Sequence, residues 1–290
     1  MSPIRRLVCA FSCLVLLSAC GAGEATLSSE GGAGPLWHTG SGTVLESPDH
    51  GPELCLGPIA ASLPPQCGGV PLVSWQWQSV SGEQTAIGTT WGEYSVTGSF
   101  DGEVLTLTEP AGDPVTPAGP GGSEGEQDPF RTPCPEPPGG WIPVDPSRSG
   151  EDAIQAANAY AQSQSDHAAF WVDYLAPADQ EPAADSPLIL NVAFTGALQR
   201  HERELRQVWG GPLCVQELEH TVAELRGIQE DFSNGAAAVF GLQILWSSSL
   251  EHQQKVEVGV VAVTDAQRQD VAERYGAGLV ELVPGLTPVQ

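Results

Sequence analysis

The sequence predicts an α+β protein in which a small all-β domain precedes a larger domain built from two ββαβ units. Three observations carry this prediction. Residues 36–108 contain short alternating apolar segments separated by turn residues. Residues 109–149 form a break in which 18 of 41 residues are Pro or Gly. Residues 150–290 repeat one strand–helix signature, which predicts a tandem domain.

The small domain, residues 36–108, is expected to fold as an OB-like barrel or a sandwich. Apolar and polar side chains alternate over residues 73–78, as in a half-buried strand. Asp101 and Gly102 separate two further alternating segments and predict a hairpin with a type I′ turn. Additional short strands are expected near residues 43–46 and 53–56.

Two similar hexapeptides predict the tandem domain. Residues 192–197 read VAFTGA, and residues 261–266, which begin 69 positions later, read VAVTDA. We expect each hexapeptide to close a strand and open a helix, with one strand before it and a short strand after the helix. The earlier strands are expected at residues 170–175 and 239–247. The result would be two ββαβ units.

Helix signals lie before, between and within these units. Ser149 and Asp152 are expected to cap a first helix. A linking helix is expected over residues 216–232, whose apolar residues share one stripe. Thr264 and Gln267 have the spacing of a capping box, which predicts the start of a helix in the second copy.

The tandem units also carry a resemblance to a known family. Residues 171–173, 192–196, 200–206 and 274–278 together resemble the pro-regions of secreted bacterial serine proteases of the α-lytic and streptogrisin type. In that family the pro-region assists the folding of its own protease domain and binds it tightly. No chymotrypsin-like domain follows in this sequence, so the resemblance implies a fold and protein binding without proteolysis.

Residues 1–19 have the features of a bacterial export signal. Arg5 and Arg6 precede an apolar stretch, residues 7–17, that is too short to span a bilayer. Residues 17–20, Leu-Ser-Ala-Cys, resemble the lipobox of bacterial lipoproteins, which implies cleavage before Cys20 and attachment of acyl chains such as palmitate to it. We therefore expect a lipid-anchored protein on the extracytoplasmic face of the cell membrane, with residues 20–35 as a flexible tether.

The charge of the chain excludes several partners. The 11 basic and 36 acidic residues give a formal net charge of −25. Removing residues 1–19 takes away only Arg5 and Arg6, so the mature chain carries 9 − 36 = −27. Such a chain should not bind nucleic acid or anionic lipid by charge. With no dense acidic run, no Cys-x-x-Cys and Lys255 as the only lysine, the sequence predicts no metal site and no cofactor.

Four cysteines remain for disulfide bonds once residues 1–19 are removed and Cys20 is acylated. They are Cys55, Cys67, Cys134 and Cys214, and in an oxidising compartment they permit three pairings. We expect Cys55 to pair with Cys67 across a short Pro-rich loop. Cys134 would then pair with Cys214 and tie the end of the linker to the second domain.

Local catalytic motifs lack the context that their chemistry needs. Residues 121–125 match G-x-S-x-G, but they lie in the Pro/Gly-rich linker instead of between a strand and a helix. His201 and Glu202 begin H-E-x-x-H, but Leu205 stands where the second histidine would be. We interpret His201 as a packed histidine. His220, beside Glu217 and Glu219, could form a metal site with His201 across facing helices, but no motif in the sequence supports such a site.

Trp75, Trp77 and Trp91 are the candidate binding residues of the small domain. They form either its core or an exposed platform for a sugar or a peptide. Taken together, the sequence predicts a non-catalytic extracytoplasmic module that binds a protein partner. The alternatives are a hydrolase whose active site is dispersed over several loops and a lipoprotein that binds a small molecule.

Overall fold

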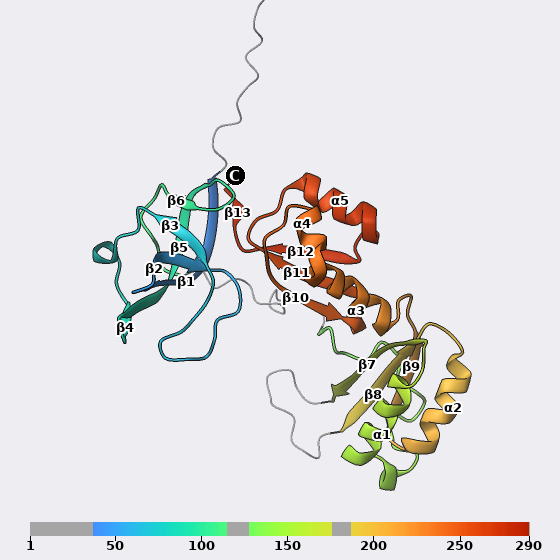
Figure 1. Ribbon diagram of the computed structural model, residues 1–290. Helices are drawn as coiled ribbons and strands as arrows, with labels where there is room; N and C mark the ends of the chain where they lie inside the picture. Colours follow the sequence, from blue (N-terminus) through green and yellow to red (C-terminus); the bar gives the residue numbers. More distant parts are fainter. Residues whose placement is uncertain (1–36, 115–127, 176–186, 290) are drawn as a thin grey trace, which may run out of the picture. The chain divides into compact units, whose positions relative to one another are not determined.

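The computed structural model describes residues 37–114, 128–175 and 187–289 (Figure 1). Cys20, the tether and the G-x-S-x-G match at residues 121–125 lie outside these ranges. Pro35–Gln290 forms one compact unit, distinct from Met1–Gly34. Every described helix, strand and apolar cluster lies inside Pro35–Gln290, so this unit has apolar cores of its own.

The described elements are strands and short helices. In chain order they are β1 (Trp37–Ser47), β2 (His50–Cys55), β3 (Val70–Val73), η1 (Trp77–Ser79), β4 (Gln84–Ala86), β5 (Thr89–Phe100), β6 (Leu105–Leu107), η2 (Pro146–Arg148), α1 (Glu151–Gln162), β7 (His167–Tyr174), β8 (Leu188–Phe194), α2 (Leu198–Val208), β9 (Leu213–Glu217), α3 (Val222–Asp231), η3 (Phe232–Ala236), α4 (Ala237–Val239), β10 (Ile244–Leu250), η4 (Glu251–Gln253), β11 (Lys255–Val260), α5 (Asp265–Tyr275), β12 (Val280–Pro284) and β13 (Thr287–Pro288).

Five of the first six strands close into a barrel. The order is β1-β2-β3-β6-β5, and β5 pairs back onto β1. The β3–β6 pair is parallel, whereas the other pairs of the barrel are antiparallel. Closure leaves these strands without a free edge, and their apolar side chains fill the interior. The buried members of that core are Val44, Leu54, Val70, Leu72, Tyr94, Val96, Leu105, Val261 and Leu286. The prediction of an all-β fold for this part of the chain is confirmed.

The chain end returns to this barrel. After β12, Leu286 is fully buried in the barrel core. β13 then pairs antiparallel with β1, joining His38 to Pro288 and Thr39 to Thr287. The barrel core therefore includes side chains from the last residues of the sequence.

Two local predictions for the barrel are wrong. The strand expected over residues 73–78 ends at Val73, because Ser74 has a left-handed backbone with φ of 69° and a 3₁₀ turn, η1, follows. The turn after β5 has four residues, with Phe100 paired to Leu105, instead of the two of a type I′ turn. There the Asp101 carboxylate accepts the N–H groups of Glu103 and Val104, at 2.9 and 2.8 Å. This side-chain capping holds the longer turn.

The C-terminal region contains the two predicted ββαβ units. In the first, β7 pairs antiparallel with β8, and α2 connects β8 to the parallel strand β9. In the second, β10, β11, α5 and β12 repeat this arrangement. A helix precedes each ββαβ arrangement, α1 before β7 and α3 before β10, so the full repeat is αββαβ (Figure 1). We call α1 to β9 the first unit and α3 to β12 the second unit.

The linking helix and one strand differ from their predicted bounds. Residues 216 and 217 belong to β9, and the helix begins only at Val222. A capping box between Thr221 and Glu224 fixes this start. The first strand of the second unit begins at Ile244, because residues 237–239 form the short helix α4. The first helix, α1, has Gly150 at its N-cap with no side-chain cap, so the capping predicted for Ser149 and Asp152 is wrong.

The two hexapeptides occupy different places in their units. Residues 192–194 lie inside β8, and α2 begins at Leu198. In the second copy β11 has already ended at Val260, and residues 261–264 form the connection to α5. The similar letters are therefore shifted along the fold by two to three residues. The repeat predicted the topology correctly but not the register.

A segment before α1 crosses one face of the first sheet. Trp171, Asn191 and Cys214 lie in one row across β7, β8 and β9. Along this row Trp171 Nε1 donates to the Phe130 carbonyl at 3.0 Å, and Thr132 Oγ1 donates to Asn191 Oδ1 at 2.7 Å. Cys134 is bonded to Cys214, and Cys55 to Cys67 in the barrel, which are the pairings expected from the sequence.

Candidate functional site

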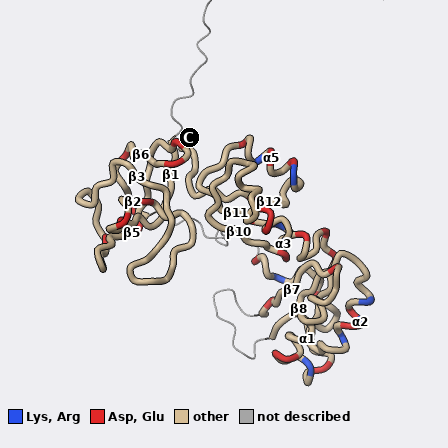
Figure 2. Tube along the Cα trace, viewed as in Figure 1, with Lys and Arg blue, Asp and Glu red and all other residues tan. Residues whose placement is uncertain are grey.

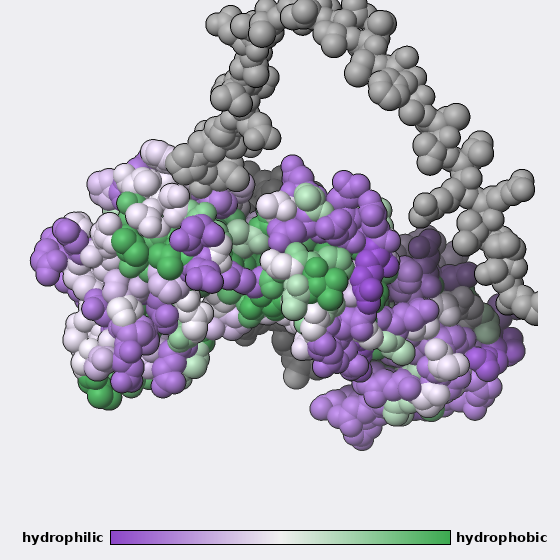
Figure 3. Space-filling view, turned by 45° about the horizontal axis from the view of Figure 1, so that its top comes forward, coloured by the Kyte–Doolittle hydropathy of each residue, from purple (hydrophilic) through white to green (hydrophobic). Residues whose placement is uncertain are grey.

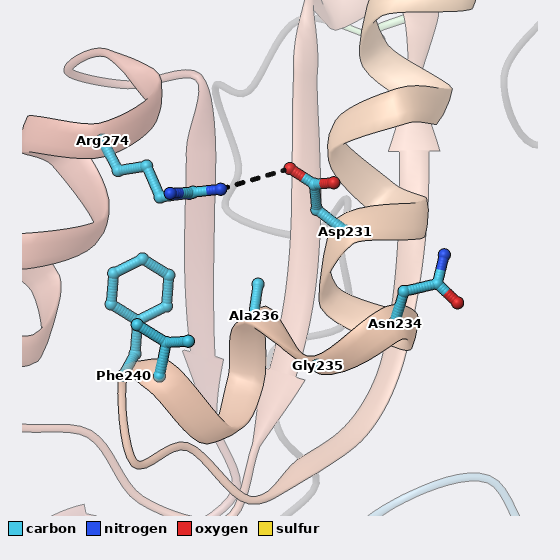
Figure 4. Close-up of a pocket in the computed structure, with 7 residues that line it drawn as sticks. Asp231, Asn234, Gly235, Ala236, Phe240 and Arg274 are labelled. Atoms are coloured by element: carbon cyan, nitrogen blue, oxygen red, sulfur yellow. Dashed lines mark ion pairs between the residues drawn. The ribbon is translucent and has the colours of Figure 1, made fainter.

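A hollow of about 320 Å³ lies beside α4 in the second unit (Figure 4). It forms because the chain kinks after α3: Gly235, within η3, has the non-helical φ of 117°, and the short helix α4 follows. Glycine adopts such a positive φ without a steric cost. The lining residues are Asp231, Asn234, Gly235, Ala236, Val239, Phe240 and Arg274.

An ion pair spans the rim of this hollow. Arg274 reaches from α5 toward Asp231 at the end of α3, with Nη2 3.8 Å from Oδ2 (Figure 4). The Tyr275 hydroxyl also donates to Asp231, at 3.3 Å, and the Arg274 guanidinium lies 5.3 Å from the centre of the Tyr275 ring. The Arg274 and Asp231 side chains are 56% and 50% exposed, so their pairing contributes little stability and both remain open to a ligand.

The floor of the hollow is apolar. Phe240 packs with Phe232 and Tyr275, each at a ring distance of 6.3 Å. Val239 on α4 is 79% exposed. The space-filling view shows hydrophobic patches among hydrophilic surface, one of them on the second unit (Figure 3). The hollow can therefore hold an apolar side chain next to a charged group.

A second hollow, of about 290 Å³, runs beside β12. It is lined by Arg268, Gly278, Val280, Glu281 and Leu282. β12 is at the edge of its three-stranded sheet, where backbone groups point away from β11. Arg268 Nη1 donates to the Leu282 carbonyl at 2.7 Å, which satisfies one of these groups.

His201 is the centre of a buried polar cluster in the first unit. Its side chain is fully buried, with Nδ1 2.9 Å from Tyr160 Oη and Nε2 2.9 Å from Asp166 Oδ2. Burial by itself would raise the pKa of Asp166, but hydrogen bonding and charge from His201, with Arg200, outweigh it and lower that pKa. The interpretation of His201 as a packed histidine is consistent with this geometry. The imidazole has no access to a substrate.

The tryptophans of the barrel are placed unequally. Trp91 is buried in a small cluster with Leu45 and Cys55. Trp75 and Trp77 are half-buried and pack edge to face, at a ring distance of 5.2 Å, against the barrel core. Trp77 Nε1 donates to Glu46 Oε2 at 2.5 Å. These contacts use the rings for internal packing and favour the core interpretation over a platform.

Metal chemistry has no candidate in the described ranges, where no group of three or more His, Cys, Asp or Glu side chains could hold an ion. The backbone N–H of His220 donates to Gln254 Oε1 at 2.7 Å in the turn before α3. The helices of the described residues include none that is long and apolar enough to cross a membrane.

Sequence reasoning missed the hollow beside α4. The available signal was Asn234-Gly235, a dipeptide that interrupts helices, followed by the small apolar residues 236–239. No protein-family model matches this chain, and no curated protein matches it.

Proposed function

We propose that this chain is an extracytoplasmic lipoprotein, held at the cell membrane through Cys20, that binds a protein partner without catalysing a reaction. The lipobox-like residues 17–20 support the anchor, and the disulfide bonds at Cys55–Cys67 and Cys134–Cys214 are in keeping with an oxidising compartment. The net charge argues against nucleic acid as the partner.

We also propose that the barrel is OB-like and that the tandem units are similar to protease pro-regions. An OB-like barrel is supported by five strands in the order β1-β2-β3-β6-β5 with one parallel pair, β3–β6. A likeness of the tandem units to protease pro-regions is supported by two successive ββαβ arrangements. A pro-region-like domain is a protein-binding domain, which agrees with the proposed role.

The observation that carries the binding role is the composition of the hollow beside α4. Val239 is 79% exposed next to the Phe240 ring, and the half-exposed Arg274 guanidinium stands at the rim. An aromatic floor with an arginine beside it is typical of the residues that dominate protein–protein binding energy. The fitting ligand is a peptide segment that inserts an apolar side chain and places a polar or acidic group near Arg274.

The buried His201 cluster argues against the hydrolase alternative. A general base has to come within hydrogen-bond reach of the group that it deprotonates. Both nitrogens of His201 already have partners, Tyr160 and Asp166, and the side chain is fully buried. These contacts serve packing in the first unit, so His201 is not available as the general base of a hydrolase.

Peptide selection followed by nuclear magnetic resonance tests the binding role. Peptides selected from a random display library on Pro35–Gln290 would be titrated into the isotope-labelled protein. We expect the backbone signals of residues 231–240 and 274–275 to shift, because these residues surround the hollow. Shifts confined to the barrel or to the first unit would contradict the proposal.

Intact-mass measurement of the protein purified from a bacterial envelope tests the anchor. The proposal requires a mature chain that begins at Cys20 and carries the mass of acyl chains. The Cys20→Ser variant should lose this mass and leave the detergent-soluble membrane fraction. A mature chain that begins at another residue and carries no lipid would contradict the anchor. It would not bear on the binding role, which the peptide experiment tests separately.

A further inference from the structure

Two aliphatic side chains stand out from the barrel. Ile87, between β4 and β5, is 84% exposed, and Leu63, in the loop between β2 and β3, is 75% exposed. Figure 1 shows the loop after β2 and the β4–β5 hairpin extending toward the same end of the barrel. We call Leu63 and Ile87 the aliphatic tips.

The backbone of Ile87 is unusual. Ile87 has a φ of 52°, and Gly88, the second residue of this two-residue turn, has a φ of 81°. Left-handed conformations are strained for β-branched residues, and Asn or Asp usually occupies the first position of such a turn. The chain therefore holds an isoleucine in a strained turn while exposing it to solvent. Strain of this kind tends to mark functional positions.

The tips are presented by well-supported segments. The Cys55–Cys67 bond closes the loop that carries Leu63, and a β-bridge joins Ala60 to Gln66 inside it. Cys67 and Ala86, the neighbour of Ile87, pack against the same small cluster around Trp91. Both tips thus project from segments that share one buried support. Rigid presentation lowers the entropic cost of binding.

The segment that carries Leu63 is uncharged, and the charges near Ile87 are acidic. Residues 54–82 contain no Asp, Glu, Lys, Arg or His, whereas Glu83 lies four positions before Ile87 and the Ile87–Gly88 turn lies against Pro48, next to Asp49. The barrel, residues 37–114, has no Lys or Arg at all, and Figure 2 shows acidic but no basic positions along its trace. The tips therefore suit an uncharged apolar environment and not an anionic surface.

We propose that the aliphatic tips insert shallowly into the uncharged surface of a lipid bilayer, as a second membrane contact besides the anchor proposed at Cys20. Aliphatic tips without nearby Arg, Tyr or Trp at the surface resemble membrane-inserting loops more than protein hot spots, in which Leu is rare.

Vesicle sedimentation of Pro35–Gln290 tests the proposal without the anchor. Phosphatidylcholine vesicles at millimolar lipid should bind the protein with a partition constant no higher than about 10⁴ M⁻¹, the strength of one acyl chain. The Leu63→Ser/Ile87→Asn variant should bind at least about fivefold more weakly. Because Ile87→Asn relieves the strained turn, it should also raise the melting temperature of the protein, so weaker binding could not come from unfolding.

An Ile142→Ser/Val144→Ser variant provides the matched control, since these side chains are also exposed, at 68% and 71%, but lie outside the barrel and the hollow beside α4. It should bind like the wild type. Binding to phosphatidylglycerol vesicles should be weaker at low salt and recover as salt is added. The proposal would be overturned if both variants lost vesicle binding equally, or if the wild type did not bind phosphatidylcholine vesicles. It would also be overturned if the tips were needed only for binding to cell envelopes, because that result would assign them to a protein partner. Peptide binding beside α4 is unaffected in all these cases.

Discussion

The imidazole ring of His201 lies flat on the phenyl ring of Phe194, with ring centroids 3.7 Å apart and planes 4° from parallel. Phe194 ends β8, and His201 begins the second turn of α2, so the contact fixes the helix on the sheet. Tyr160 from α1 reaches the same imidazole. One histidine therefore joins three elements of the first unit.

Replacing this histidine should destabilise the protein strongly. His201→Ala removes a fully buried ring and leaves Asp166 and Tyr160 without their partner, which should lower the free energy of unfolding by about 2–4 kcal/mol. Tyr160→Phe, which removes one hydroxyl, should cost only about 1 kcal/mol. Urea unfolding followed by circular dichroism measures both. If both variants lost the same free energy of unfolding, His201 would not be the residue that holds the cluster together.

The stability of the protein should fall in mildly acidic solution because of His167. Burial lowers the pKa of its imidazole below the value in the unfolded chain, which is about 6.5. The unfolded chain then binds the proton more readily, so the stabilising contribution is complete above about pH 6.5 and is lost as the pH falls through the folded-state pKa.

His167→Gln removes this dependence. Between about pH 7.5 and about pH 5 the wild type should lose more melting temperature than the variant does. His50→Gln, at the exposed start of β2, serves as the control and should follow the wild type. Parallel pH profiles for the wild type and His167→Gln would refute this assignment.

Two glycines should respond to alanine in opposite directions. A Cβ on Gly259 in β11 would lie 2.1 Å from Trp246 Nε1, so Gly259→Ala has to displace the indole and should cost about 1–3 kcal/mol. Gly227 in α3 has open space around its Cα, and Gly227→Ala should stabilise the protein by about 0.5–1 kcal/mol. Thermal unfolding distinguishes the two variants. A lower melting temperature for Gly227→Ala would contradict the open space found around Gly227.

The two disulfide bonds should contribute unequally. Cys134–Cys214 closes a separation of 80 residues and Cys55–Cys67 one of 12. Chain entropy predicts about 4.5 kcal/mol for the longer loop and about 3 kcal/mol for the shorter one. Paired Cys→Ser variants compared by urea unfolding should show this order. The reverse order would mean that residues 128–134 stay on the first sheet without their covalent tie.

Topology was easier to predict from the sequence than local backbone. The tandem hexapeptides identified two ββαβ units because a strand, a helix and a second strand each have a period that the sequence displays. Their register was missed because the residues before a helix N-cap can belong to a strand or to a connection. The helix start at Thr221 was missed for a related reason. Leu218, in the turn after β9, has a helix-like spacing to Val222 in α3, so the apolar stripe begins before the helix does.

The candidate site was harder still. Alternation predicted a strand through Trp75 and Trp77, but one left-handed residue, Ser74, ends it, and such a conformation has no strong sequence signal outside Gly and Asn. The hollow beside α4 depends on the kink at Gly235 and on Arg274, which is 39 positions further along the chain. Only the tertiary arrangement brings these residues together.

The affinity of a selected peptide for a Val239→Asp variant tests the central claim most directly. Val239 is exposed and absent from the buried cores, so the substitution should leave the fold intact while placing a like charge near Asp231. Isothermal titration should show at least about tenfold weaker binding to Val239→Asp, and wild-type affinity for the matched Val144→Asp control. Unchanged affinity for Val239→Asp would contradict a protein-binding role for the hollow beside α4.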